Sequence, residues 1–299
     1  MTMIERLWIG TVALGLPYGP SRSMATEQEA FRILDTAIDL GVTAFDTAVA
    51  YGIAEDRIGA WIQSKPQPLT ICSKLPKARS HNQENGAAWV NQHIAESTRK
   101  LGRPPDYYIC HVAKDFQFAP IREALMEAVE TGRIGATGVS GYAPEDVIPA
   151  LELPEACALV QMPGSAIDHR YRSHPLTSRI KAQKCRLMLR SLFLQGALLM
   201  ETSKLPDHLK SGLSPFITRL RQTAEDLGVA VPVLALASVL NSDAPLEAVL
   251  GFHSAKEMAF LSDTRLSNSV GPEILANLME EAKTIDPNLI DPRFWPKID

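Results

Sequence analysis

An acid and a tyrosine are spaced along the chain in a way that could support proton transfer. Asp46 follows a short apolar run at residues 42–45, and Tyr51 lies five residues later, immediately before Gly52. An apolar run of this length predicts a buried strand. A carboxylate at the C-terminal end of a strand, with a polar aromatic in the next loop, is how an α/β barrel presents catalytic groups. Taken alone, Asp46 could equally be a helix cap or a hydrogen-bonded core residue.

Two further ionisable side chains lie at the ends of predicted strands. Lys74 ends the run at 69–74, and His111 lies in the run at 107–112. Because the C-terminal ends of neighbouring barrel strands open on one mouth, we expect both to converge with Asp46 and Tyr51. Each residue has a plainer interpretation: a solvated strand end for Lys74, a core histidine for His111, a packing aromatic for Tyr51. Their occurrence on three adjacent strands favours one site.

Together these four side chains have the chemistry of a proton donor. A tyrosine hydroxyl has a pKa near ~10, and a neighbouring ammonium favours the phenolate and lowers that pKa. A buried lysine stays charged when a carboxylate such as Asp46 faces it. A histidine beside the phenol can hydrogen-bond a substrate carbonyl. The set contains no nucleophile, so it needs an external hydride source.

The elements that would position these residues alternate between short apolar runs and amphipathic helical segments. The predicted strands lie at residues 7–15, 42–46, 69–74, 107–112, 134–140, 157–162, 186–192 and 246–251. Eight such units predict a single-domain α/β fold, a (β/α)8 TIM barrel over residues 1–299. A doubly wound sheet is the rival fold, but residues 14–19 lack its glycine-rich turn. Residues 112–115 and 201–215 are expected to be loops over the site.

One helix start has a specific sequence signal. Thr26 and Glu29 form a predicted capping box at the start of the first long helix.

Composition narrows the class of partner. The chain is 45% hydrophobic with a formal net charge of -4, which argues against nucleic acid or an anionic membrane surface as the main partner. The longest apolar run, 187–200, is interrupted by Arg190 and Gln195 and is not expected to span a bilayer. Four separated cysteines fit reduced thiols in a cytoplasmic protein, and the seven histidines lack metal-ligand spacing. We therefore expect no metal site.

Over nearly its whole length the sequence resembles the aldo-keto reductase superfamily. The resemblance rests on Asp46-Thr47-Ala48 with Tyr51-Gly52, Lys74, Tyr108-Ile109-Cys110-His111, Gly138-Val139-Ser140, Gln161, residues 190–196 and Gly251-Phe252-His253-Ser254. It implies a nicotinamide cofactor extended across the barrel mouth and the reduction of an aldehyde, ketone or sugar. It also implies that Tyr51 is the proton donor, that Lys74 and Asp46 tune it, and that His111 orients the carbonyl.

The same resemblance implies a set of binding residues. The cofactor contacts would come from Thr11, from Ser140 and Gln161 at the carboxamide, from Arg190, Ser191, Phe193, Gln195 and Gly196 near the nicotinamide and pyrophosphate, and from Gly251, His253, Ser254 and Glu257 at the adenosine end. Trp8 and Val112 are expected to line the substrate pocket, with residues 112–116 and 205–216 as further candidate walls.

Three positions depart from the family pattern. Gly141 stands where asparagine is usual, Arg190 where many members carry an aromatic, and Glu257 where many NADPH-specific members carry arginine or glutamine. A carboxylate at Glu257 favours a ribose hydroxyl over a phosphate. The cofactor expected first is NADP(H), followed by NAD(H). The run 190–196 looks most like bacterial members associated with sugar-type substrates.

Two other functions fit parts of the pattern. A Schiff-base lyase or aldolase would use Lys74 as its nucleophile. A non-catalytic regulatory protein would bind the nicotinamide nucleotide without turnover. The tail at 292–296 could fold over the barrel mouth or lie outside it.

Overall fold

Eight parallel strands close into a barrel in the computed structural model, which describes residues 2–19, 23–65, 67–79, 85–154, 157–241, 246–263 and 270–296. Each strand pairs with the next along the chain, and the last pairs with the first. The strands are β1 (Leu7–Gly10), β2 (Ala44–Asp46), β3 (Thr70–Leu75), β4 (Tyr107–Cys110), β5 (Ala136–Ser140), β6 (Leu159–Pro163), β7 (Arg186–Arg190) and β8 (Leu246–Gly251). The predicted (β/α)8 barrel is confirmed.

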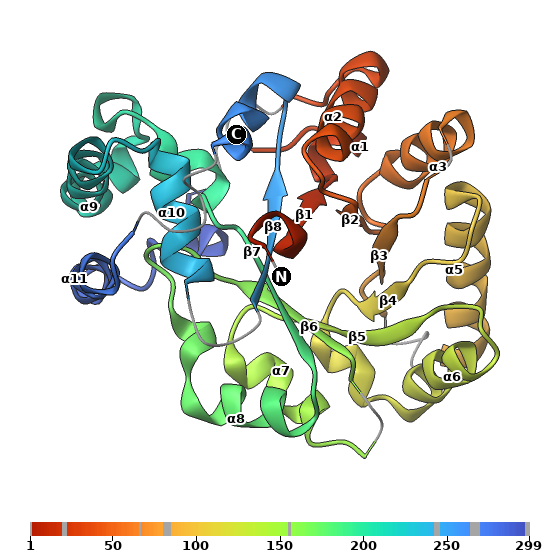
Figure 1. Cartoon of the computed structure of the whole chain (residues 1–299). Helices are drawn as coiled ribbons and strands as arrows, with labels where there is room; N and C mark the ends of the chain where they lie inside the picture. The colour runs from red at the N-terminus through yellow and green to blue at the C-terminus, as the bar shows by residue number, and fades with distance from the viewer. Residues whose placement is uncertain are drawn as a thin grey trace.

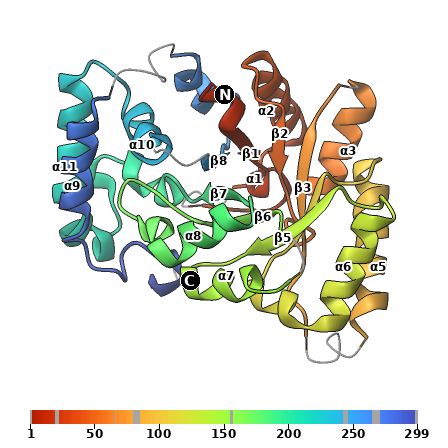
Figure 2. The ribbon, with the colours of Figure 1, turned by 60° about the horizontal axis from the view of Figure 1, so that its bottom comes forward.

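Helices surround the barrel (Figure 1). The α-helices are α1 (Val12–Gly15), α2 (Glu27–Asp39), α3 (Ala54–Ser64), α5 (Gly86–Leu101), α6 (Ala119–Glu130), α7 (Pro144–Leu151), α8 (His174–Ala182), α9 (Asp207–Asp226), α10 (Val231–Leu240) and α11 (Pro272–Ala282). The 3-10 helices are η1 (Ile4–Arg6), η2 (Ala113–Gln117), η3 (Arg170–Arg172), η4 (Leu194–Leu199), η5 (Thr202–Lys204), η6 (Ala255–Ser262) and η8 (Pro292–Phe294). In Figure 2, α9 and α11 lie side by side on one flank.

Two apolar layers form the core. The larger layer lies between the strands and the helices and includes Leu7 and Ile9. The smaller layer fills the barrel interior and consists of Trp8, Cys72, Ile109, Leu159, Met188 and Val249. Alternate residues of a strand face opposite sides, so Trp8 points inward while its two neighbours point toward the helices.

A cluster of polar side chains lies at the N-terminal end of the barrel, next to Trp8. The indole Nε1 of Trp8 donates a hydrogen bond of 3.1 Å to Glu247. Arg186 pairs with the same carboxylate and donates to the hydroxyl of Tyr107 at 2.6 Å. Since Glu247, Arg186 and Tyr107 lie at the starts of their strands, Trp8 belongs to the end opposite the mouth. The prediction that Trp8 lines the substrate pocket is therefore wrong.

Several predicted boundaries need correction. The first strand ends at Gly10, and residues 12–15 form α1 instead of continuing the strand. The stretch 201–215 is mostly helical, because α9 begins at Asp207 and includes Pro215. Its apolar residues recur at helical spacing and pack inward, which outweighs the cost of one proline. Helix α7 was not predicted, and residues 113–117 form the short helix η2.

The start of α2 agrees with half of the predicted capping box. The hydroxyl of Thr26 accepts a hydrogen bond from the backbone N–H of Glu29 at 3.2 Å. The Glu29 carboxylate accepts from the backbone N–H of Ala255 at 2.9 Å. Glu29 therefore ties α2 to the loop that follows β8.

Across the described ranges, no single helix is both long and apolar enough to cross a membrane. Among the described residues, α9 and α10 taken together meet the length and composition criteria, and a 99° bend separates them.

Candidate active site

A buried ion pair links the ends of β2 and β3. The ammonium nitrogen of Lys74 lies 2.6 Å from Oδ1 of Asp46 and donates a second hydrogen bond, of 2.8 Å, to the carbonyl of Thr47. Lys74 is two residues after Cys72, so strand alternation places its side chain in the barrel interior. Both members of the pair are buried.

The surroundings of Lys74 keep it charged. Burial by itself lowers the pKa of Lys74, but Asp46 and Tyr51 oppose burial and leave that pKa raised above its ordinary value. Removing Asp46 alone would leave the Lys74 ammonium as an uncompensated buried charge, and removing Lys74 alone would do the same to the Asp46 carboxylate.

A close backbone approach fixes the loop that carries Tyr51. Gly52 has φ +60°, in the left-handed region that favours glycine, and a Cβ there would meet the carbonyl oxygen of Gly15 at 2.3 Å. The N–H of Ile53 donates to that same oxygen at 3.2 Å. The glycine contact lets the second loop pack directly on α1, and this packing fixes the position of Tyr51.

The structure brings Tyr51, Lys74, Asp46 and His111 together. The rings of Tyr51 and His111 meet edge to face, with centroids 5.8 Å apart and planes at 85°. The ammonium of Lys74 lies 5.0 Å from the Tyr51 ring centroid. His111 follows β4 and is anchored by its N–H, which donates to the carbonyl of Leu75 at 3.1 Å.

Burial decides the protonation of both rings. Burial raises the pKa of Tyr51 above 10.0, although the charges of Lys74 and Arg190 act in the opposite direction. The ammonium of Lys74 lowers the pKa of Tyr51, as expected, but burial outweighs this effect, so the expected net decrease is wrong. Burial, with the positive charges of Lys74 and Arg190, lowers the pKa of His111 to about 3. At neutral pH the site holds a protonated phenol and a neutral imidazole.

Gln161 extends the ion pair across the barrel. Its amide Nε2 donates to Oδ1 of Asp46 at 2.7 Å and contacts the sulfur of Met188 at 3.0 Å. The hydroxyl of Ser140 lies 3.5 Å from Oε1 of Gln161. These two predicted carboxamide ligands are buried and connected to Asp46 through hydrogen bonds.

A cavity of about 730 Å³ opens at the mouth above Tyr51 and His111. The predicted binding residues that line it are Thr11, Arg190, Ser191, Phe193, Gln195, Gly196, Gly251, His253 and Glu257. Within the described ranges, Ser140, Gln161, Ser254 and Val112 are not part of its lining. The cavity therefore runs from Asp46, Tyr51 and His111 to the loop after β8.

The predicted walls at 112–116 and 205–216 are also absent from the lining formed by described residues. Phe116, Leu209 and Phe216 are buried in the outer core instead. These side chains belong to the packed apolar core and do not line the cavity.

Unusual backbone follows β7 at the edge of the cavity. Ser191, Leu194 and Gln195 have φ values of 64°, 49° and 54°, and Gly196 has φ 91°. Left-handed backbone at non-glycine residues is uncommon and concentrates at ligand clamps. Such turns direct backbone N–H groups into concavities that suit anions.

Two carboxylates accept backbone hydrogen bonds from the segment after β8, one from within that segment and one from α2. Glu257 accepts a hydrogen bond from the N–H of His253 at 2.9 Å, and Glu29 accepts from the N–H of Ala255. The backbone donor of Ala255 lowers the pKa of Glu29.

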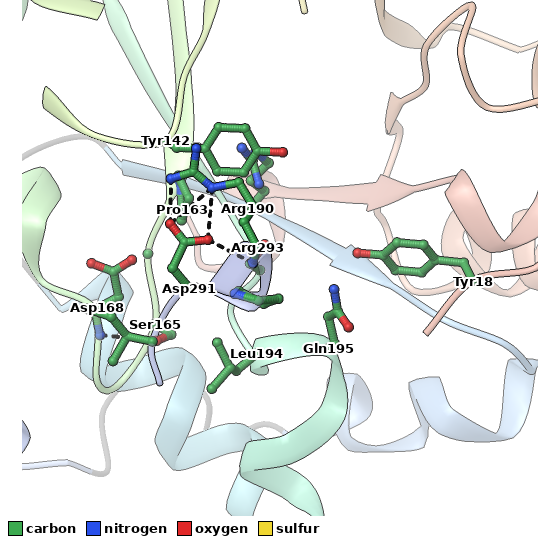
Figure 3. Close-up of a pocket in the computed structure, with 14 residues that line it drawn as sticks. Tyr18, Tyr142, Pro163, Ser165, Asp168, Arg190, Leu194, Gln195, Asp291 and Arg293 are labelled. Carbon is green, nitrogen blue, oxygen red and sulfur yellow. Dashed lines mark hydrogen bonds and ion pairs between the residues drawn. The ribbon is translucent and has the colours of Figure 1, made fainter. Parts of the chain in front are cut away.

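A side pocket of about 220 Å³ adjoins the main cavity, and Figure 3 shows its lining. The ring of Tyr142 lies between two guanidinium groups, with the Cζ atoms of Arg190 and Arg293 at 4.4 Å and 3.7 Å from its centroid. Asp291 holds Arg293 through several hydrogen bonds, including one of 2.9 Å from Nε. The tail that the sequence left open thus folds against the mouth.

Sequence reasoning missed Tyr18, Tyr142 and Arg293. Tyr18 lies in the first loop and lines both cavities. Tyr142 follows Gly141, so the departure from the family pattern at that glycine was a usable signal. The sequence carried no comparable signal for Arg293, because its position depends on where the tail packs.

The part of the chain that the structure describes contains no group of three or more His, Cys, Asp or Glu side chains able to hold a metal ion.

Known proteins resemble this chain in sequence and in fold. The model of the aldo/keto reductase family matches residues 6–262. The oxidoreductase YrpG of Bacillus subtilis, described as uncharacterized, is 26% identical over 158 residues, which are 47% of this chain and 46% of that relative. This match therefore spans less than half of the relative.

Two of the solved structures that share the fold illustrate the likeness. An aldo/keto reductase from Klebsiella pneumoniae, in complex with NADP and acetate, has a TM-score of 0.72 and 22% identity over 91% of this chain and 89% of that one. The thermostable aldo-keto reductase Tm1743, in complex with the inhibitor epalrestat, has a TM-score of 0.69 and 19% identity over 92% and 94%.

Proposed function

Because this chain belongs to the aldo-keto reductase family, we propose that it is an NAD(P)(H)-dependent oxidoreductase that interconverts a carbonyl and an alcohol. The observation that carries the proposal is the grouping of Tyr51 and His111 at a cavity, with the buried Lys74–Asp46 pair behind them. The substrate class is an aldehyde, ketone or sugar.

In the proposed reaction Tyr51 donates its proton to the carbonyl oxygen. The ammonium of Lys74, charged and beside the ring, stabilises the phenolate that remains. Neutral His111 donates a hydrogen bond to the same oxygen and orients the carbonyl. Asp46 keeps Lys74 charged and in place.

The nicotinamide cofactor, when bound, supplies the hydride that the carbonyl carbon accepts. The cavity residues fit such a group. The cavity has a volume of about 730 Å³, and part of its wall is the turn at 191–196, whose left-handed backbone is of the kind that concentrates at ligand clamps. The Nδ1 of His253 is a buried polar atom with no partner among the described residues, near the end where the adenosine would lie.

NADP(H) is the cofactor we propose first, supported by the NADP complex of the Klebsiella pneumoniae neighbour. Glu257 and Glu29 at the loop after β8 make NAD(H) the alternative, because carboxylates hydrogen-bond ribose hydroxyls and repel a phosphate.

The geometry disfavours the Schiff-base alternative. A lysine nucleophile must be neutral. Lys74 is fully buried, paired with Asp46, and has a raised pKa. A regulatory protein that only binds the nucleotide has no need of a phenol and an imidazole facing its cavity.

The test mixes the purified protein with NADPH or NADH and a panel of aldehydes, ketones and sugars, and follows cofactor absorbance. Turnover with at least one carbonyl is expected. Tight cofactor binding by tryptophan fluorescence, with no turnover on any substrate in either direction, would favour the regulatory alternative.

A further inference from the structure

Each of the two carboxylates that line the side pocket is paired with an arginine, but one of the two arginines that line it has no carboxylate partner among the described residues. Asp168 pairs with Arg170 through contacts of 2.9 Å and 2.7 Å. Asp291 pairs with Arg293. No carboxylate of the described residues lies within ion-pair distance of Arg190, the remaining arginine in this pocket.

The contacts of Arg190 leave most of its donors available. Its Nη2 donates to the carbonyl of Gly141 at 3.1 Å, and its Cζ lies 4.4 Å from the Tyr142 ring centroid. Neither contact neutralises the charge of the guanidinium. A guanidinium presents five N–H donors in a rigid fork.

Arg190 stands where the two cavities meet. It lines the side pocket and also the main cavity, which contains Tyr51 and His111. Its charge acts on both rings, since it helps to lower the pKa of His111 and opposes the raised pKa of Tyr51. A molecule whose carbonyl faces Tyr51 can therefore extend toward Arg190.

A half-buried guanidinium without a counter-ion is incompletely compensated, and a planar carboxylate fits its fork in a bidentate geometry. We propose that the carbonyl substrate carries a carboxylate that pairs with Arg190 at the entrance to the side pocket. This inference rests on the proposed function and narrows its substrate class to aldehyde, keto or sugar acids.

The kinetic test uses substrate pairs that differ in the carboxylate: D-glucuronate with D-glucose, and 4-oxobutanoate with butanal. We expect a kcat/KM roughly tenfold or more higher for the acid of a pair, the range of a charge-assisted hydrogen bond. In Arg190→Met the ratio of kcat/KM for the acid to kcat/KM for the neutral substrate should fall toward one, even if both values change. Arg190→Lys should keep part of the preference for the acid. Arg179→Met is the control, because Arg179 pairs with Glu152 on the exterior and should leave the ratio unchanged.

A binding test is independent of turnover. Isothermal titration calorimetry with succinate and its neutral diamide, with and without NADPH, should show tighter binding of succinate to wild type, and Arg190→Met should abolish the difference. Inorganic phosphate is titrated in parallel. Phosphate binding as tightly as succinate would overturn the assignment of a carboxylate.

Two other results would overturn the proposal. One is an equal preference for succinate over the diamide in wild type and Arg190→Met. The other is a loss of NADPH affinity in Arg190→Met with an unchanged acid-to-neutral ratio, which would assign the guanidinium to the cofactor pyrophosphate. Absence of turnover with every carbonyl contradicts the proposed function, while the calorimetry still decides whether Arg190 binds a carboxylate.

Discussion

Gln161 on β6 donates a hydrogen bond across the barrel interior to Asp46 on β2, with Nε2 2.7 Å from Oδ1. The same oxygen accepts from Lys74 at 2.6 Å. A residue expected to hold the nicotinamide carboxamide thus also supports the ion pair behind Tyr51. In the function that we propose, cofactor binding and proton transfer share one buried network.

Replacing Gln161 by leucine should destabilise the protein. The substitution removes a hydrogen bond to a charged acceptor, and such bonds contribute about 1.5–3 kcal/mol. Denaturant unfolding measures the loss. Ser140→Ala is the control, because the Ser140 hydroxyl makes only a 3.5 Å contact with Gln161 and should cost less. Equal losses in the two variants would show that the bond to Asp46 contributes nothing measurable.

Removing one member of the Lys74–Asp46 ion pair should reduce the free energy of unfolding more than Gln161→Leu does. Asp46→Asn leaves the Lys74 ammonium buried without a counter-charge, which typically costs about 3–5 kcal/mol. The double variant Asp46→Leu, Lys74→Met removes both charges and should recover part of that loss in the same unfolding measurement. A double variant less stable than Asp46→Asn would contradict a purely electrostatic origin of the cost.

Carbonyl reduction should vary little with pH across the neutral range. The folded-state pKa of Tyr51 is raised, so the phenol stays protonated and its proton is lost only as pH rises above about 10. The pKa of His111 is lowered to about 3, so the imidazole stays neutral throughout. The pH profile of kcat/KM should therefore be flat from about pH 5 to 9. A change in kcat/KM with a midpoint near pH 6.5 that is absent in His111→Asn would show that His111 titrates there, and would contradict a neutral imidazole across this range.

Much of the site could be predicted because its signals are local in sequence. The residues at or near the ends of β2, β3 and β4 must meet at the mouth once the barrel closes, so Asp46, Lys74 and His111 followed from strand order. Trp8 was misplaced because its depth along the barrel axis, at the end opposite the mouth, depends on how the first strand is set against its neighbours. The sign of the Tyr51 pKa shift depends on burial, and Arg293 reaches the mouth only through packing of the tail. Neither can be read from spacing.

Gly141 shows a departure from the family pattern with a steric cause. A Cβ at this position would lie 2.6 Å from Val147 Cγ1 and 2.8 Å from the Cβ of Asp146, so no side chain fits without movement. Gly141→Ala should cost about 1–3 kcal/mol through overpacking. Gly251→Ala is the control, since its Cβ would meet nothing closer than 3.9 Å. Thermal unfolding of both variants measures the loss of stability. If Gly141→Ala is as stable as wild type, α7 moves to accommodate the Cβ at little cost.

The central claim is that Tyr51 supplies the proton, and Tyr51→Phe tests it most directly. The substitution keeps the ring beside His111 and Lys74 but removes the hydroxyl, so NADPH affinity should be retained by fluorescence titration. The rate of cofactor oxidation in a single turnover, followed by stopped-flow absorbance with a substrate that wild type reduces, should fall about 100- to 10,000-fold. A single-turnover rate equal to that of wild type, with cofactor binding intact, would contradict the account.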